Sequence, residues 1–155
     1  MEAQPILNAH NKAEHKESHT CEHILNGTMV KMFGCPRSKI AHVEKKKSKC
    51  DYLLDNEPTA EQVAAIEAKV NEEIAKNHDV TIEYMTREDA GRIVDLSKLP
   101  EDASETLRIV RIGDYDVCAC IGAHVSNTSE IGTFKIISHS FTEGVWRLRW
   151  KVANA

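Results

Sequence analysis

The chain has 155 residues, of which 41% are hydrophobic and 28% are charged, and its formal net charge is −4. These values are ordinary for one globular domain, and no apolar run approaches the roughly 20 residues that span a bilayer, so collagen-like, coiled-coil and membrane-spanning classes are excluded. Five cysteines, an odd number, and an amino terminus without a secretory-signal pattern exclude a disulfide scaffold and predict a reduced, cytoplasmic protein.

The first predicted element is a helix over residues 19–33. Ser18 is a favoured N-cap residue, and Gly34 is typical of the position that follows a helix end. Apolar side chains recur at helical spacing within this segment, at Ile24, Leu25, Met29 and Met32. His19 and His23 lie one turn apart, so we expect their imidazoles on the same face of the helix.

Residues 39–55 have the pattern of a β-hairpin with a lysine-rich tip. A second helix is predicted to begin after Thr59, because Gln62 three residues later completes a capping box. The helix is expected to end near Asn77. Its buried stripe is predicted from apolar residues at helical spacing, namely Val63, Ile66, Val70 and Ile74.

The remainder of the chain is rich in strand patterns. Strands are predicted over residues 80–84, 107–112, 115–120, 134–141 and 145–152. A short helix begins at Thr86 and cannot continue past Pro100. The predicted fold is therefore α+β, with a mostly antiparallel sheet packed with two long helices and one short helix. Residues 1–17 are interpreted as a loose lead-in to a single domain over residues 18–155.

Charge is distributed unevenly along the chain. Residues 31–49 carry seven basic side chains against one acidic one, whereas residues 55–105 carry fourteen acids against five bases. Basic residues also alternate with apolar ones in the last predicted strand. A candidate footprint for a polyanion is thus formed by Lys45, Lys46, Lys47, Arg147, Arg149 and Lys151. Two alternatives stay open, namely a solvated surface and basic residues that protect an edge strand from aggregation.

Histidine and cysteine carry the strongest chemical signal. His19-x-x-x-His23 places two imidazoles on one helical face, and Cys120-x-x-x-His124 follows the end of a predicted strand. One thiolate and three imidazoles form a ligand set that suits Zn²⁺. The spacing does not prove that the two pairs meet. Four protein ligands make a closed structural site, whereas a site that lacks one ligand can hold a catalytic water.

A rival interpretation is a metallopeptidase. Residues 19–23 also fit the H-x-x-E-H pattern, in which Glu22 is the general base. The third ligand in that scheme is a carboxylate from another helix, for which the candidates are Glu67, Glu72 and Glu73. The chain is short for a peptidase, and the scheme gives Cys120 and His124 no role.

Longer stretches around these residues resemble a known family. Residues 19–25, HTCEHIL, are similar to the H-[ST]-x-x-H-[IL]-L helix of the alanyl-tRNA synthetase editing domain. Residues 111–115, 120–125 and 128–136 resemble, in the right order, the stretch of that domain that contains C-x-G-x-H-V and T-x-E-I-G-x-F-K-I. A threonyl-tRNA synthetase editing domain is expected to have proline where this chain has Ala123, so the resemblance favours the alanyl branch.

The resemblance implies a short-form, free-standing AlaX-type protein, which hydrolyses tRNA(Ala) wrongly charged with serine or, in some cases, glycine. It implies a synthetase editing-domain fold, mischarged tRNA(Ala) as partner and Zn²⁺ as cofactor. The zinc ligands carried over by the motif are His19, His23, Cys120 and His124. The chain departs from the family pattern at Cys118, where an acid or amide is usual, and at Ser129, where glycine is usual.

The catalytic step stays open at this point, and no general base is assigned. Zinc is expected to polarise the ester carbonyl, to orient the amino acid or to activate a water. Selection of serine over alanine requires a group that bonds the serine hydroxyl, and the candidates are Thr20, Thr28 and Thr128. The alternative to an enzyme is a zinc-stabilised domain that binds tRNA or protein without turnover. The oligomeric state is not predicted by any pattern in the sequence.

Overall fold

The computed structural model describes residues 15–38, 40–94 and 106–153. The elements, in chain order, are α1 (Lys16–Phe33), β1 (Ile40–His42), β2 (Ser48–Leu53), α2 (Ala60–Ala75), β3 (Val80–Thr86), α3 (Arg87–Ala90), β4 (Thr106–Ile112), β5 (Asp116–Ala119), the 3₁₀ turn η1 (Thr128–Glu130), β6 (Thr133–Thr142) and β7 (Val145–Ala153). The α+β class with two long helices and one short helix is confirmed.

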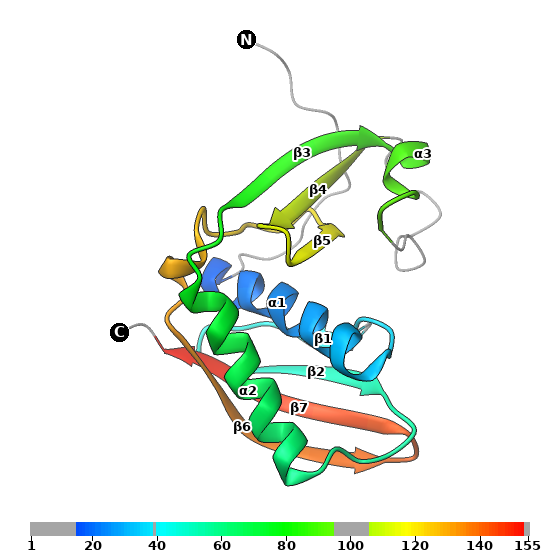
Figure 1. Cartoon of the computed structure of the whole chain (residues 1–155), viewed down its shortest axis with the longest axis vertical. Helices are drawn as coiled ribbons and strands as arrows, with labels where there is room; N and C mark the ends of the chain where they lie inside the picture. Colours follow the sequence, from blue (N-terminus) through cyan, green and yellow to red (C-terminus); the bar gives the residue numbers. More distant parts are fainter. Residues whose placement is uncertain (1–14, 39, 95–105, 154–155) are drawn as a thin grey trace.

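The strands form two antiparallel sheets rather than one. One sheet has the order β1-β2-β7-β6, and the other has the order β3-β4-β5. Figure 1 shows α1 between the two sheets, and α2 packed beside it over the larger one. The alternating pattern predicted the buried and outer faces of β7 correctly, but in β3 the apolar residues Ile82 and Tyr84 are exposed like their polar neighbours. The pattern also carried no information on which strands pair. The division into two sheets was therefore not predicted.

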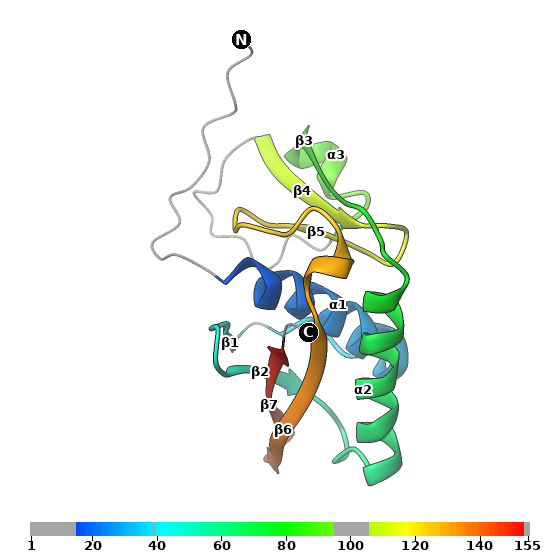
Figure 2. The ribbon, with the colours of Figure 1, turned by 90° about the vertical axis from the view of Figure 1, so that its left-hand side faces the viewer.

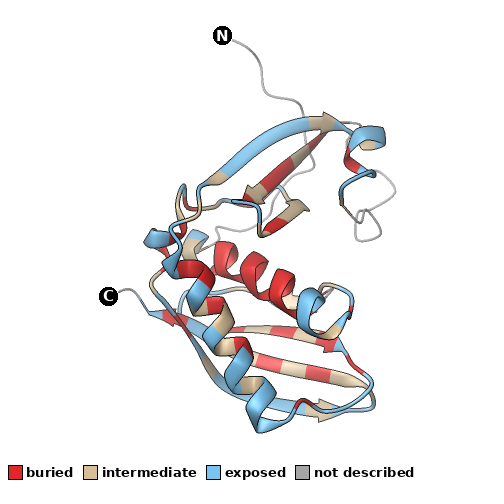
Figure 3. Cartoon of the chain, in the orientation of Figure 1, coloured by how far each residue is buried: buried red, intermediate tan, exposed pale blue. Residues whose placement is uncertain are grey.

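The position of α1 explains its unusual burial. Every residue from Ser18 to Met29 is buried, although eight of these twelve positions are polar or charged residues or glycine, far more than in a helix with one solvent face. Figure 2 shows the helix lying between β5 and the larger sheet, and Figure 3 shows it buried over most of its length. One side of α1 therefore packs into the apolar core, and its other side meets the smaller sheet and the loop after it.

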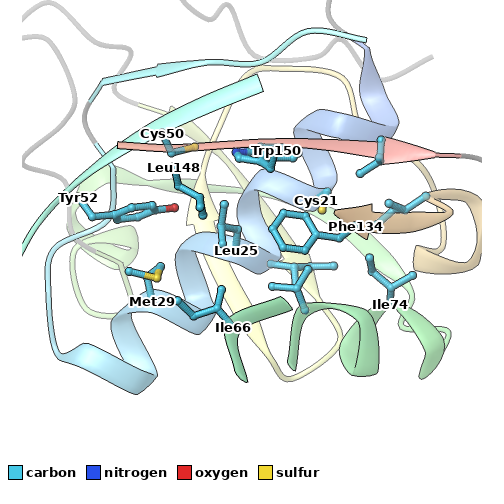
Figure 4. Close-up of a cluster of buried hydrophobic side chains, with 14 of the residues drawn as sticks. Cys21, Leu25, Met29, Cys50, Tyr52, Ile66, Ile74, Phe134, Leu148 and Trp150 are labelled. Atoms are coloured by element: carbon cyan, nitrogen blue, oxygen red, sulfur yellow. The ribbon is translucent and has the colours of Figure 1, made fainter. Parts of the chain in front are cut away.

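The main core lies between the two long helices and the larger sheet. Figure 4 shows α1 side chains, including Leu25 and Met29, packed with residues of α2 and of the sheet. The largest fully buried side chains are Trp146, Trp150, Tyr52 and Phe134, all from the larger sheet. The predicted stripe of α2 is confirmed at Ile66, Val70 and Ile74, whereas Val63 is half-buried. Close packing of these large apolar side chains makes the larger sheet a rigid support for α1.

Helix boundaries differ from the sequence prediction at one place. α1 begins at Lys16, three residues before the predicted start at His19, and its N-cap is His15 rather than Ser18. The His15 Nδ1 atom accepts a hydrogen bond of 3.3 Å from the Ser18 backbone N–H, the role that a serine or aspartate oxygen usually plays. The capping box at Thr59 and Gln62 is confirmed.

Two predictions extend outside the described residues. The lead-in over residues 1–17 falls mostly in the segment 1–14, and the limit at Pro100 falls in the segment 95–105. Within the described part, α3 ends at Ala90. In that same part, no helix combines the length and apolar character needed to cross a membrane.

Candidate metal centre

The two histidine and cysteine pairs meet in space. α1 supplies His19 and His23, and the loop after β5 supplies Cys120 and His124. One ligand atom from each of the four lies within 4.8 Å of the others. The imidazole rings of His19 and His124 are stacked with centroids 4.3 Å apart, and His23 meets His124 edge-on at 4.5 Å. The spacing in the sequence did not establish that the His19–His23 pair meets the Cys120–His124 pair. The structure shows that the two pairs do meet.

The loop that carries Cys120 is fixed by Arg108 of β4. Its guanidinium Nη1 donates to the backbone carbonyls of Cys120 and Gly122, at 3.1 and 2.6 Å. The Cys120 backbone N–H donates in return to the Arg108 carbonyl at 3.0 Å. The Gly122 N–H donates to Cys120 Sγ at 3.4 Å, a contact that favours the thiolate form of Cys120. No sequence pattern identifies Arg108, because its role depends on the strand pairing that brings the loop back to β4.

Two of the three histidines are held in a defined tautomer. His19 Nδ1 lies 3.2 Å from the Ala123 carbonyl, which only accepts, so Nδ1 carries the hydrogen. Thr20 Oγ1 donates to the Lys16 carbonyl at 2.8 Å, so it accepts from His124 Nδ1 at 3.0 Å. Both imidazoles thus offer a bare Nε2 atom, the state in which histidine binds a metal ion.

His124 gives the clearest test of whether these residues fit a metal ion. Its Nε2 atom is buried and has no hydrogen-bond partner among the residues that the structure describes. Burial is the main cause that lowers the pKa of His124, and the nearby His19 and Arg108 act in the same direction, so that together they bring it to about 3. The imidazole is therefore neutral over the physiological pH range, and a buried neutral nitrogen without a donor is suited to a metal ligand.

One distance between ligand atoms can be compared with that expected around a zinc ion. Around a tetrahedral centre with nitrogen at about 2.0 Å and sulfur at about 2.3 Å, two nitrogens lie roughly 3.3 Å apart and a nitrogen and a sulfur roughly 3.5 Å apart. The distance from His19 Nε2 to Cys120 Sγ is 3.4 Å. The donor set of one sulfur and three nitrogens is compatible with zinc, and the four residues form a possible metal site.

Glu22 lies beside the histidine cluster, but the carboxylates that the peptidase interpretation offers as a third ligand do not. Glu22 is buried, and its Oε1 atom lies 3.8 Å from His19 Nε2. The three proposed third ligands are engaged elsewhere, because Glu67 accepts from the Ile136 N–H, and Glu72 and Glu73 pair with Lys69. Among the described residues, the group that brings metal-binding atoms together contains none of these three. The structure therefore offers no support for the carboxylate ligand of that scheme.

The three candidate threonines all bond to other protein groups. Thr20 lies at the cluster, where its hydroxyl donates to one group and accepts from His124 Nδ1 and the Val125 N–H, so its bonding capacity is full. Thr28 donates to the Ile24 carbonyl and contacts the Tyr115 hydroxyl at 2.6 Å. Thr128, also buried, bonds the His78 N–H and the Ile74 carbonyl. Thr20 thus positions His124, and a substrate role for the other two stays a prediction.

The basic residues lie on the outer face of the larger sheet, opposite the helices. β7 is flanked by β2 and β6, so protection of an edge strand does not explain them. Arg147 is held by Asp51 through two hydrogen bonds of 2.8 and 2.9 Å. The strand register sets Arg149 opposite Lys49, and Lys151 opposite Lys135. The tip lysines Lys45, Lys46 and Lys47 are exposed between β1 and β2.

Comparison with known proteins gives a consistent set of relatives. The family described as threonyl and alanyl tRNA synthetase second additional domain matches residues 107–149, which include Cys120 and His124. The alanine–tRNA ligase 1 of Lachnoclostridium phytofermentans is 32% identical over 141 residues, covering 90% of this chain and 16% of the ligase. The alanine–tRNA ligases of Halorhodospira halophila and Ligilactobacillus salivarius are 31% and 33% identical over 82% and 84% of this chain. The chain spans 15% of the length of each of these two.

Proposed function

The chain belongs to the threonyl and alanyl tRNA synthetase second additional domain family, and on that premise we propose that it is an aminoacyl-tRNA deacylase. Its substrate is tRNA(Ala) mischarged with serine, and glycine is a second acyl group that it removes. Water adds to the carbonyl that joins the amino acid to the terminal ribose, and the bond to the ribose oxygen breaks. The products are a free amino acid and an intact tRNA, and the reaction takes place in the cytoplasm.

The observation that carries this proposal is the cluster of His19, His23, Cys120 and His124. These residues come from two segments a hundred positions apart in sequence, and both segments resemble the editing domain of alanyl-tRNA synthetase. A zinc ion bound to these four residues supplies Lewis-acid polarisation of a carbonyl or a bound water of lowered pKa. The protein itself holds two of the imidazoles in the required tautomer through the Ala123 carbonyl and Thr20.

Recognition of the RNA is proposed to use the outer face of the larger sheet. Like charges directly opposite one another on neighbouring strands cost stability, and this face carries two such pairs, Lys49 with Arg149 and Lys135 with Lys151. A phosphate backbone relieves that repulsion when it binds. Arg147 contributes less, because Asp51 already neutralises it. The contacts are to phosphates, so they position the RNA without reading its sequence.

A second candidate function is a zinc-stabilised domain that binds tRNA without turnover. The observation in its favour is that all four ligands of a closed structural site are present. The variant His19→Ala separates the two functions. A folded protein that no longer releases serine supports catalysis, whereas an unfolded protein supports a structural ion.

The direct test is the rate of serine release from Ser-tRNA(Ala), compared with alanine release from Ala-tRNA(Ala). We expect rapid loss of serine, retention of alanine and inhibition by a chelator, with recovery on addition of Zn²⁺. Cys120→Ser is expected to abolish release, and the matched control His139→Ala, at an exposed position on β6, is expected to retain it. Release of neither amino acid by a zinc-loaded protein would overturn the proposal.

A further inference from the structure

An ion pair with a buried carboxylate lies directly behind the metal centre. Asp116, the first residue of β5, accepts hydrogen bonds from Nη1 and Nη2 of Arg37 at 2.6 and 3.2 Å. The Asp116 side chain is 4% exposed. Its Oδ2 atom lies 3.7 Å from Nδ1 of His23. The carboxylate therefore joins a residue of the loop after α1 to one of the candidate metal ligands.

The helix that carries His23 has a glycine where this carboxylate approaches. A Cβ atom added at Gly27 would lie 2.9 Å from Asp116 Oδ1 and 3.4 Å from its Cγ. Glycine inside a helix is less stable than alanine by roughly 0.5–1 kcal/mol. α1 thus has a residue unfavourable to a helix at a position where a larger side chain would crowd the Asp116 carboxylate.

The loop that carries Arg37 is itself anchored to α1. The Ser38 backbone N–H donates to the Asn26 side-chain oxygen at 3.3 Å. The same oxygen accepts a hydrogen bond of 2.6 Å from the Tyr52 hydroxyl, within the core. Asn26, which binds this loop, lies next to Gly27, the position that Asp116 approaches. Neighbouring residues of α1 therefore position both the loop and the carboxylate. Arg37 is held relative to the helix, and it fixes Asp116 in turn.

The Asp116 carboxylate faces the Nδ1 atom of His23. The other two histidines of the cluster are oriented through Nδ1 by the Ala123 carbonyl and by the Thr20 hydroxyl. A carboxylate only accepts hydrogen bonds, so Asp116 selects the tautomer of His23 that carries hydrogen on Nδ1 and leaves Nε2 bare. The separation of 3.7 Å exceeds the 2.7–3.2 Å of a formed hydrogen bond, so the influence of the carboxylate on Nδ1 in this structure is electrostatic.

We propose that Asp116, fixed by Arg37 and seated against Gly27, is the positioning residue that orients His23 toward the metal ion. This inference rests on the proposed metal centre, and it assigns Asp116 no contact with the substrate. A carboxylate behind a metal-bound histidine raises the basicity of the ligand and fixes the ring. Loss of such a partner lowers metal affinity by about 10–100-fold in other proteins.

The test compares zinc affinity in Asp116→Asn with that in the wild-type chain, by competition with a chromophoric chelator. The matched control is Asp51→Asn, which also removes a charge from a carboxylate held by two hydrogen bonds from an arginine, but on the far face of the larger sheet. We expect Asp116→Asn to weaken zinc binding about 10–100-fold and Asp51→Asn to leave it unchanged. Equal zinc affinity in wild type and Asp116→Asn would overturn the inference.

A second measurement keeps the inference testable if Asp116→Asn does not fold. The ¹⁵N shifts of His23 in the metal-free wild-type protein report its tautomer. We expect hydrogen on Nδ1, and hydrogen on Nε2 would overturn the role of Asp116. Wild-type protein that binds no zinc would instead contradict the proposed metal centre, so the two failures are distinguishable.

Discussion

At the scale of single residues, the candidate metal centre depends on groups that do not themselves touch the ion. Thr20, Arg108 and Asp116 each hold one ligand or the loop that bears it. None has the spacing of a metal-binding motif, and each acts through a contact between elements far apart in sequence. Sequence patterns therefore identify the four candidate ligands but not the groups that set their orientation.

Thr20→Val tests the first of these groups. Valine keeps the shape of threonine but leaves His124 Nδ1 and the Val125 N–H without the acceptor they now share. We expect the free energy of unfolding of the metal-free protein to fall by about 1–3 kcal/mol, together with weaker zinc binding. Denaturant unfolding and chelator competition measure the two effects. Thr81→Val, at an exposed site on β3, is the control and is expected to change neither.

Glu73 gives a prediction on pH dependence. Burial raises the pKa of this carboxyl, but hydrogen bonds from Lys76, His78 and Lys69 outweigh burial and lower it to about 2. The folded-state pKa lies below the unfolded value, so the stabilisation is complete above about pH 4.5 and is lost as the pH falls toward 2.

Glu73→Gln is therefore expected to lower stability at pH 6 and to have little effect near pH 2. Urea unfolding at a series of pH values measures this. The neighbouring Glu72→Gln removes an exposed partner of Lys69 and is expected to change stability little at any pH. A loss in Glu73→Gln that is the same at pH 6 and at pH 2 would contradict the assignment.

At the scale of elements, α1 links the core to the metal centre. Its apolar side packs on α2 and the larger sheet, and its polar side presents His19 and His23 to the loop after β5. The period of apolar residues predicted the first side. The burial of the second side was not predictable, because it results from the smaller sheet that covers the helix.

Gly27→Ala tests how closely the elements meet. On helix propensity alone alanine should stabilise α1. We expect a loss of stability instead, because the new methyl carbon would lie 2.9 Å from Asp116 Oδ1 and would force the carboxylate to move. The reference is Ala64→Gly at an exposed position in α2, where propensity alone predicts a loss of about 1 kcal/mol. A more stable Gly27→Ala protein would show that the carboxylate has room to move.

One substitution on the outer face of the larger sheet is expected to raise stability and to lower affinity for tRNA. Lys151→Glu replaces a like-charge pair with Lys135 by an opposite-charge pair, so stability should rise by roughly 0.2–1 kcal/mol. Affinity for tRNA should fall, and its dependence on salt should become less steep. Thermal unfolding and filter binding measure the two effects. Arg92→Glu, an equal change of charge on the chain near α3, is expected to leave tRNA affinity unchanged.

At the scale of the whole molecule, the sequence predicted the α+β class, the helices and most strand positions, because these depend on local periodicity and caps. It did not predict the division into two sheets, since pairing depends on contacts between distant strands. The Arg147, Arg149 and Lys151 face illustrates the difference. Alternation placed these residues on one face correctly, but the edge-strand explanation was wrong because β7 lies between two strands.

The central claim is that one ion is held by one sulfur and three nitrogens. X-ray absorption at the zinc edge of the purified protein, with elemental analysis, measures this directly. We predict one zinc per chain, with one sulfur at about 2.3 Å and three nitrogens at about 2.0 Å, and loss of the sulfur shell in Cys120→Ser. A chain that retains no zinc, or a zinc shell without sulfur in the wild-type protein, would contradict the account.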